Sequence, residues 1–495
     1  MRHHRIVIVG SGFSGLGMAI GLKRVGIEDF IILERADDLG GTWRDNTYPG
    51  CACDIPSNLY SFSFAPNPHW TRFFAGQPEI LTYLRRCADR YGILPHLRYG
   101  HELLQARWDS PSDRWHLETS QGAITAQVII TGMGPLSEPA RPALPGLDSF
   151  AGTVFHSASW DHSHDLTGRR VGVVGTGASS IQFVPRIAPR VEQLHVFQRT
   201  APWIVPRPDR AVTPTEARMF RTVPGAQVVR RAASYGIREL TGHGLRGNPR
   251  LLARMSKLAA GHLASQVRDP ALRARLTPDY TIGCKRILLS SDFYPALQRG
   301  NVELATSRIA RVRPDAVVTE DGVGRLVDTL ILATGFHVAD LPAGRRLRGR
   351  DGRLMSEVWE GSSQAYLGTT VAGFPNLFLL VGPNTGLGHN SIVYMIESQI
   401  AYVLAGLRAM ARAGVSVVEV RSEVQDAYNS RVQSDMAGTV WTAGGCASWY
   451  LDSAGRNTTL WPSSTWAFRR QTRRFRLADY LTAAPSASPA VRAGT

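Results

Sequence analysis

The sequence predicts an α/β protein built from two Rossmann-like domains. Near the N-terminus, a short β-branched strand, a glycine-rich turn and a helix follow one another, and the same succession returns near residue 170. Between residues 214 and 278, helical spacing and few strand signals predict a helical insertion in the second domain.

The first unit begins with the predicted strand Ile6–Val9 and continues into a helix, Leu16–Arg24. Its G-x-G-x-x-G glycines are Gly10, Gly12 and Gly15. Glycines at this spacing permit a tight turn and let a pyrophosphate reach the helix N-terminus. The next strand, Phe30–Leu33, runs into Glu34, which can accept hydrogen bonds from a ribose diol and would repel a 2′-phosphate. This unit therefore suits the adenosine of FAD.

The second unit has the same order, with strands predicted at Arg170–Val174 and Leu194–Phe197. Its motif supplies Gly175, Gly177 and Ser179, with Ser180 in place of the third glycine. No acid follows the second strand. Arg199 and Thr200 stand there instead, and an arginine at this point favours a 2′-phosphate. The sequence thus predicts NADPH/NADP⁺ as the second dinucleotide.

Two further strands end in Thr-Gly, at residues 128–132 and 330–335, and we expect both to turn near a cofactor. The later strand lies beyond the second unit, which predicts that the second domain is inserted into the first. The expected division is 1–145 and 325–482 for the FAD-binding domain and 146–324 for the NADP-binding domain. Residues 483–495 are small and Pro-containing, so a disordered tail is expected there.

The charge, the cysteine content and the lack of long apolar runs exclude several classes of protein. The net charge of +16 comes from arginine, and residues 186–286 alone hold 17 arginines and two lysines against six acids. No nucleic-acid-binding motif accompanies them, so no nucleic-acid partner is expected, whereas a substrate anion or a membrane surface stays open for the arginine-rich segment. Five scattered cysteines argue against a disulfide scaffold and a metal site and favour a reduced compartment. With no predicted membrane span or signal peptide, we expect a cytoplasmic protein; the oligomeric state is not indicated.

Two longer patterns identify a family. Residues 150–161 match F-x-G-x-x-x-H-x-x-x-W-[PD], and residues 40–54 match [AG]-G-x-W-x4-[FY]-P-[GM]-x3-D. Together with the glycine motifs and Ala333-Thr334-Gly335, they cover roughly residues 5–480 in the expected order. The chain resembles type I Baeyer–Villiger monooxygenases, within the superfamily of flavin-containing monooxygenases.

The resemblance implies an FAD that NADPH reduces and that reacts with O2 to a flavin C4a-peroxide, which converts a ketone to an ester or lactone. Arg286 of Gly283-Cys284-Lys285-Arg286 matches the family's catalytic arginine, and Asp54 matches the acid that orients it. Arginine suits this role because it stays protonated and a carboxylate can hold its planar fork. The family's remaining cofactor contacts match Gly41, Thr42, Trp43, Asp54, Lys285 and Trp449. In the family, the histidine and tryptophan matched by His156 and Trp160 are hinge residues of the linker, so no proton transfer by His156 is expected.

Three other functions stay open. A flavin monooxygenase that oxidises sulfur or nitrogen in a thioether or amine shares these patterns and does not need the Arg286–Asp54 pair. A disulfide reductase-like flavoprotein needs a redox-active cysteine pair, for which Cys51-x-Cys53 is poorly spaced. A non-catalytic flavin- or membrane-binding protein would use the arginine-rich insertion.

Overall fold

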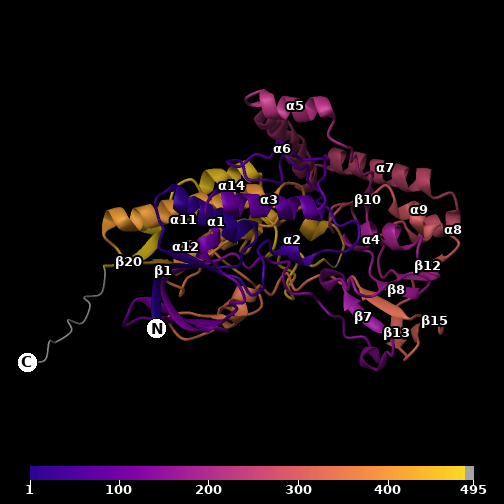
Figure 1. Cartoon of the computed structure of the whole chain (residues 1–495), viewed down its shortest axis with the longest axis horizontal. Helices are drawn as coiled ribbons and strands as arrows, with labels where there is room; N and C mark the ends of the chain where they lie inside the picture. Colours follow the sequence, from indigo (N-terminus) through magenta and orange to yellow (C-terminus); the bar gives the residue numbers. More distant parts are fainter. Residues whose placement is uncertain (447, 485–495) are drawn as a thin grey trace, which may run out of the picture.

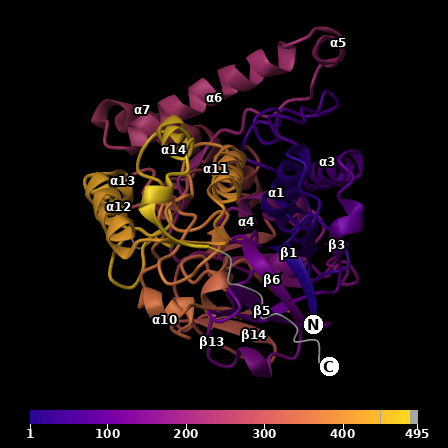
Figure 2. The same cartoon turned by 90° about the vertical axis from the view of Figure 1, so that its left-hand side faces the viewer.

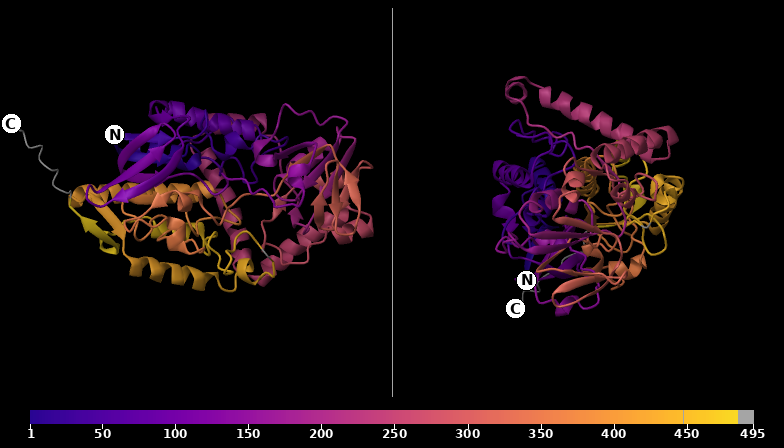
Figure 3. Two further views of the ribbon diagram at one scale, coloured as in Figure 1. Left: turned by 90° about the horizontal axis from the view of Figure 1, so that it is seen from below. Right: turned by 90° about the vertical axis from the view of Figure 1, so that its right-hand side faces the viewer.

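The computed structural model describes residues 1–446 and 448–484 (Figure 1). Two sheets dominate it, and Figure 3 shows them at opposite ends of the long axis, with the N-terminus at the end of the first sheet. Both contain parallel strands followed by helices, so the predicted α/β class is confirmed.

The first sheet has the strand order β17-β4-β5-β6-β1-β2-β3, and β18 pairs with β6. The central strands are parallel, with Ile6 of β1 opposite Phe30 of β2 and Val128 of β6. Strand β5 pairs in the antiparallel sense with β4 on one side and with β6 on the other. The strands span Arg2–Val9 (β1), Phe30–Leu33 (β2), Leu97–Arg98 (β3), Leu103–Asp109 (β4), Arg114–Thr119 (β5), Gly122–Thr131 (β6), Leu347–Arg348 (β17) and Leu377–Leu379 (β18).

Helices α1, α3 and α11 lie together over this sheet in Figure 1. Residues 13–22 of α1 are all buried, because the helix packs between the sheet and α11. The α-helices of this part of the chain are Phe13–Arg24 (α1), Thr42–Asp45 (α2), Gln77–Arg90 (α3), Met355–Trp359 (α10), Ile392–Ala413 (α11), Ser422–Met436 (α12), Val440–Ala443 (α13) and Thr465–Gln471 (α14).

The second sheet is parallel throughout, in the order β12-β9-β8-β16-β7. Its strands are Thr153–His156 (β7), Arg170–Val174 (β8), Gln193–Phe197 (β9), Val302–Ala305 (β12) and Thr329–Leu332 (β16). The nearby short elements are Ser180–Ile187 (α4), Ile204–Val205 (β10), Leu288–Leu289 (β11), Phe293–Leu297 (α9), Ile309–Val312 (β13), Ala316–Thr319 (β14) and Gly324–Leu326 (β15). Because β16 pairs with β7 and β8, the boundary expected at 324/325 falls before a strand of this sheet.

Four helices follow between β10 and β11. They are Pro214–Thr222 (α5), Ala226–Leu245 (α6), Pro249–Gln266 (α7) and Pro270–Arg275 (α8). Figure 2 shows α5, α6 and α7 along the upper edge of the molecule. In the described part of the chain, none of the helices combines the length and apolar character needed to cross a bilayer.

The C-terminal segment reaches the first domain as strand β20, Tyr480–Ala483, which pairs with β19, Val417–Val420. Ala483 therefore belongs to a strand and not to the expected disordered tail. Residues 485–495 of that expected tail lie outside the described residues.

Candidate functional site

A cavity of about 1180 Å³ lies where the carboxyl ends of β1 and β8 meet. Both glycine motifs line it, as do Asp54, Arg286 and Trp449. Ligands of open α/β sheets bind at such strand ends, next to helix N-termini. The two predicted dinucleotide motifs thus share one cavity.

The first glycine motif is held by close backbone contacts. Gly10 has φ +95°, and a Cβ there would lie 2.7 Å from the carbonyl oxygen of Gly132. A Cβ on Gly15 would lie 1.8 Å from the carbonyl oxygen of Gly10, which is far inside van der Waals contact. Gly12 instead lines the cavity beside Gly41. The first and third glycines therefore shape the turn, and the second leaves room for a ligand.

Glu34 is buried at the end of β2 and is fully engaged by protein groups. Its Oε2 accepts hydrogen bonds from the backbone N–H (3.0 Å) and hydroxyl (2.6 Å) of Ser11. Its Oε1 accepts from the N–H of Ala36 at 3.1 Å and pairs with Arg44 at 2.8 Å. Burial alone would raise the pKa of Glu34, but Ser11 and Arg44 lower it below its usual value. Since a carboxylate offers about four acceptor sites, a ribose diol must displace one of these partners.

The second glycine motif differs at its third position. A Cβ on Gly175 would lie 2.6 Å from the carbonyl oxygen of Ala333, so the predicted approach of the Ala-Thr-Gly segment is present. A Cβ on Gly177 would meet no atom within 4 Å, and this glycine and Ser179 face the cavity. Ser180 donates its hydroxyl to the carbonyl of Gly175 at 2.7 Å. A side-chain hydrogen bond thus closes the turn where a third glycine would otherwise stand.

Two cations face the cavity beyond β9. Arg199 and Thr200 line it together with Lys285, whose ammonium lies 5.0 Å from the centre of the Tyr280 ring. Burial lowers the pKa of Lys285, and the positive charge of Arg199 lowers it further. Within the described residues, neither cation forms an ion pair with a carboxylate. Two adjacent unpaired cations form a site for an anion such as a phosphate.

Arg286 and Asp54 form an ion pair on the cavity wall. Arg286 donates from Nε at 3.0 Å and from Nη2 at 2.5 Å, both to Oδ2 of Asp54. The charge of Asp54 raises the pKa of Arg286, while burial opposes it. Burial would raise the pKa of Asp54, but the charge of Arg286 overcomes it and lowers that pKa. The guanidinium is therefore held as a permanent cation facing the cavity.

Arg238 is a second cation at this pair, and no sequence pattern indicated it. It projects from α6 and donates from Nη2 to the backbone carbonyl of Asp54 at 3.2 Å. Burial lowers the pKa of Arg238, while the charge of Asp54 opposes that shift. Because Arg238 lies among many arginines of an arginine-rich segment, no spacing signal distinguished it.

The Gly41-Thr42-Trp43 segment places the start of α2 against the first glycine motif. A Cβ on Gly41 would lie 3.2 Å from Cα of Gly12. Trp43 is buried and donates from Nε1 to the hydroxyl of Tyr60 at 3.1 Å. Trp43 also accepts a short hydrogen bond from the side chain of Gln77 at its backbone carbonyl. All three residues of the segment line the cavity.

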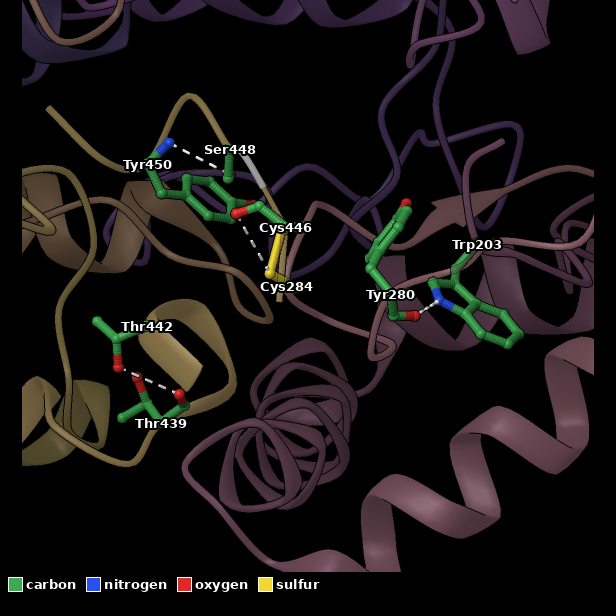
Figure 4. The surroundings of a disulfide bond; sticks show 8 residues. All are labelled: Trp203, Tyr280, Cys284, Thr439, Thr442, Cys446, Ser448 and Tyr450. Carbon is green, nitrogen blue, oxygen red and sulfur yellow. Dashed lines mark hydrogen bonds between the residues drawn. A yellow bond between two sulfur atoms is a disulfide. The ribbon is translucent and has the colours of Figure 1, made fainter. Parts of the chain in front are cut away.

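A disulfide joins the Arg286 segment to the Trp449 segment (Figure 4). Cys284 and Cys446 are 162 residues apart, and their Cα atoms lie 6.1 Å from each other. Trp449 is 45% exposed and stacks obliquely on Tyr450, with 4.3 Å between the ring centres. The expectation of reduced cysteines is wrong for this pair, because only the folded chain brings two such distant thiols together.

His156 does not line the cavity, although its neighbour Phe336 does. Its Nδ1 accepts a hydrogen bond from the N–H of Ala158 at 3.0 Å, and its ring meets Phe336 edge to face. Burial lowers the pKa of His156, which favours the neutral ring. The second fingerprint aromatic, Trp160, packs on Phe155 and Phe183. His156 and Trp160 therefore make the packing contacts expected of residues in a linker between domains.

Gln182 of α4 is a further contact that no motif indicated. Its Oε1 accepts from the hydroxyl of Tyr48 at 3.1 Å, and its Nε2 donates to the carbonyl of Ala52 at 3.0 Å. It therefore ties the loop that carries Asp54 to the helix of the second glycine motif. Within residues 1–446 and 448–484, no group of three or more His, Cys, Asp or Glu is arranged to hold a metal ion.

Comparisons with known proteins agree with this arrangement. A family profile described as pyridine nucleotide-disulphide oxidoreductase matches residues 7–241. A Baeyer-Villiger monooxygenase of Streptomyces coelicolor is 50% identical over 485 residues, which cover 98% of this chain and 93% of the relative. A Baeyer-Villiger monooxygenase of Pseudomonas aeruginosa is 50% identical over 491 residues, with the same coverage of 98% and 93%.

Solved structures extend the likeness to the whole fold. The closed crystal structure of cyclohexanone monooxygenase superposes with a TM-score of 0.87 at 27% identity, covering 98% of this chain and 100% of the other. OTEMO in complex with FAD and NADP gives 0.87 at 26% identity, covering 97% and 99%. Oxidized steroid monooxygenase bound to NADP gives 0.86 at 28% identity, covering 98% of this chain and 100% of the other.

Proposed function

The chain belongs to the Baeyer–Villiger monooxygenases, and we propose that its Arg286–Asp54 pair is the centre at which a small ketone is converted to an ester or lactone. The protein is an FAD- and NADPH-dependent monooxygenase that uses O2. The observation that carries the proposal is the paired guanidinium on the wall of the cavity that both glycine motifs line.

The residues present fit both cofactors. Gly12 and Gly177 leave open backbone at two helix N-termini, where the pyrophosphates of FAD and NADPH would be held. Gly41, Thr42 and Trp43 would contact FAD, and Trp449 the ribose of NADPH. FAD, once reduced by NADPH, supplies the oxygen-transfer chemistry with O2 as the oxidant.

Arg199, Thr200 and Lys285 are proposed to bind the 2′-phosphate of NADPH. The two cations lack carboxylate partners within the described residues, so they can be neutralised by a ligand phosphate. Glu34, with its ring of donors, is proposed to receive the adenosine ribose of FAD after one donor turns away. This division supports NADPH rather than NADH as the reductant.

Arg286 is proposed to stabilise the negative charge that develops on the ketone oxygen as the carbonyl carbon becomes tetrahedral. Asp54 holds the guanidinium in one orientation, and Arg238 holds the backbone of Asp54. A preorganised cation of this kind needs no reorganisation at the moment of reaction.

The test is oxygenation of a panel of cyclic and linear ketones with NADPH under ¹⁸O2, with mass analysis of the products. The proposal expects esters or lactones that carry one ¹⁸O atom and expects Arg286→Ala to form them about 10²–10³-fold more slowly. Ester formation by Arg286→Ala at the wild-type rate would refute the role of the pair. Oxidation of thioethers or amines but of no ketone would establish the heteroatom-oxidising alternative.

Two further proposals concern the boundary of the NADP-binding domain and the cellular location of the protein. We propose that the inserted NADP-binding domain extends from about residue 146 through β16, which is longer than the expected 146–324, because β16 pairs within its sheet. We also propose a cytoplasmic location: the free cysteines Cys51, Cys53 and Cys87 agree with it, whereas the Cys284–Cys446 disulfide argues against it. Cell fractionation tests the location. Because disulfides persist mainly in oxidising compartments, recovery of the protein outside the cytoplasm would agree with the Cys284–Cys446 disulfide and contradict the proposed location.

A further inference from the structure

Helix α6 presents its apolar side to the outside of the molecule. Val228, Val229, Ile237 and Leu240 are 66%, 71%, 68% and 61% exposed. At 100° per residue, they and the exposed small residues between them span about half of the helix circumference. The small residues are Ala232, Ala233 and Gly236. The same arc also contains the exposed His243 and Glu239, whose carboxylate accepts hydrogen bonds from Asn390 and Thr465.

The inward side of α6 is the polar side. Arg231 donates to the carbonyls of the 58–61 loop and pairs with Glu397 at 3.7 Å. Arg238 donates to Asp54, and Glu239 accepts hydrogen bonds from Asn390 and Thr465. A helix on the surface of a water-exposed protein normally buries its apolar stripe and exposes its charges. In α6 this arrangement is reversed.

The neighbouring helices α5 and α7 also carry exposed apolar side chains and exposed cations. Met219 and Val223 near α5 and Leu258 of α7 are exposed large apolar side chains. The exposed cations are Arg218 and Arg221 of α5 and Arg250, Arg254 and Lys257 of α7. Along α5–α7 the only acids are Glu216, which pairs with Arg210 at 2.6 Å, and the inward Glu239. Figure 2 shows these helices together on one edge of the molecule.

We propose that the α5–α7 face docks on an anionic lipid surface. This face consists of the exposed apolar side chains of α6 and the exposed apolar side chains and cations of α5 and α7. Interfacial helices combine an apolar face, which enters the boundary between headgroups and acyl chains, with cations that attract anionic headgroups. A second copy of the chain fits less well, since a two-fold contact would oppose the same five cations. The inner side of α6 contacts the Asp54 loop, so docking would set the lipid against the helix that borders the catalytic pair. The proposal does not depend on the ketone reaction.

The test is co-sedimentation of the FAD-loaded full chain with vesicles of phosphatidylcholine, alone or mixed with phosphatidylglycerol. We expect binding to the mixed vesicles that weakens as NaCl is raised. Replacing Arg218, Arg250, Arg254 and Lys257 by Gln should weaken binding about five-fold per cation. The triple variant Val229→Asp, Ile237→Asp and Leu240→Asp should weaken binding at least ten-fold, because aspartate cannot enter the lipid.

A matched control replaces exposed leucines outside this face. Leu104→Asp and Leu326→Asp lie on β4 and β15 and are 53% and 48% exposed in the parent. They should leave vesicle binding unchanged, and FAD content and NADPH oxidation show that each variant is folded. Equal binding by the α6 triple variant, equal binding to neutral vesicles, or self-association through the face with no lipid binding would each overturn the proposal.

Discussion

Replacement of Arg286 tests the proposed chemistry most directly. The guanidinium makes two hydrogen bonds to Oδ2 of Asp54, at 3.0 and 2.5 Å. Arg286→Ala removes the cation, and loss of one preorganised stabilising group lowers kcat by about 10²–10³-fold. Arg286→Lys keeps the charge but cannot donate from two positions of a planar fork. Loss of one hydrogen bond between charged groups is worth about 1.5–3 kcal/mol, which is about 10–150-fold in rate.

The assay measures ester formation and NADPH consumption side by side. The expected order for ester formation is wild type, then Arg286→Lys, then Arg286→Ala. Consumption of NADPH should fall much less than ester formation, because Arg286 belongs to neither glycine motif. FAD content and Tm exclude unfolding as the cause. If Arg286→Lys is as inactive as Arg286→Ala, orientation outweighs charge; if Arg286→Ala keeps ester formation within about three-fold of wild type, the reasoning from charge stabilisation is refuted.

The remaining predictions concern the cofactors and stability. Gly15→Ala should lose FAD on gel filtration, because its Cβ would lie 1.8 Å from a backbone oxygen, whereas Gly177→Ala, with no atom within 4 Å, should retain FAD; equal retention by both would contradict the steric argument. Lys285→Ala should raise KM for NADPH about 10–150-fold and leave KM for NADH nearly unchanged, and parallel changes would exclude a phosphate contact. Burial opposes ionisation of Glu239, but hydrogen bonds around it lower its pKa from 4.5 to about 2. Its ionised form therefore stabilises the fold above pH 4.5, so Glu239→Gln should lower Tm at pH 7, and the difference should shrink as the pH falls from 4.5 towards 2; a difference independent of pH would contradict this. Cys284→Ser should lower Tm as much as dithiothreitol lowers that of the wild type, since the disulfide closes a long loop, and dithiothreitol should then have no further effect on the variant.

Local chemistry made much of the fold predictable. The strand Phe30–Leu33 and the strand Arg170–Val174 have the predicted bounds, because a short apolar run that ends at a polar residue or a glycine turn is a signal within about ten residues. Each glycine turn places its helix N-terminus at the strand end by its own backbone geometry. The predicted roles of Glu34 and Arg199 follow from the same local unit, although these roles remain predictions.

The contacts within the site depended on long-range folding. Asp54 and Arg286 were paired in advance only through the family resemblance, since no spacing rule links two residues that are 232 positions apart. The Arg44 partner of Glu34 and the contribution of Arg238 were not indicated at all. A pattern cannot rank one arginine of a rich segment above another, because the path of the chain decides which one reaches a carboxylate.

The sequence alone therefore determined two dinucleotide-binding units, their order and the family, since turn chemistry and hydrophobic period act over a few residues. The tertiary structure decided that Cys284 meets Cys446, that β16 closes the second sheet and that the polar side of α6 faces inward. The helical period of residues 226–245 predicts that α6 has two different faces. Which face is covered depends on the segments packed against the helix, and these come from distant parts of the chain.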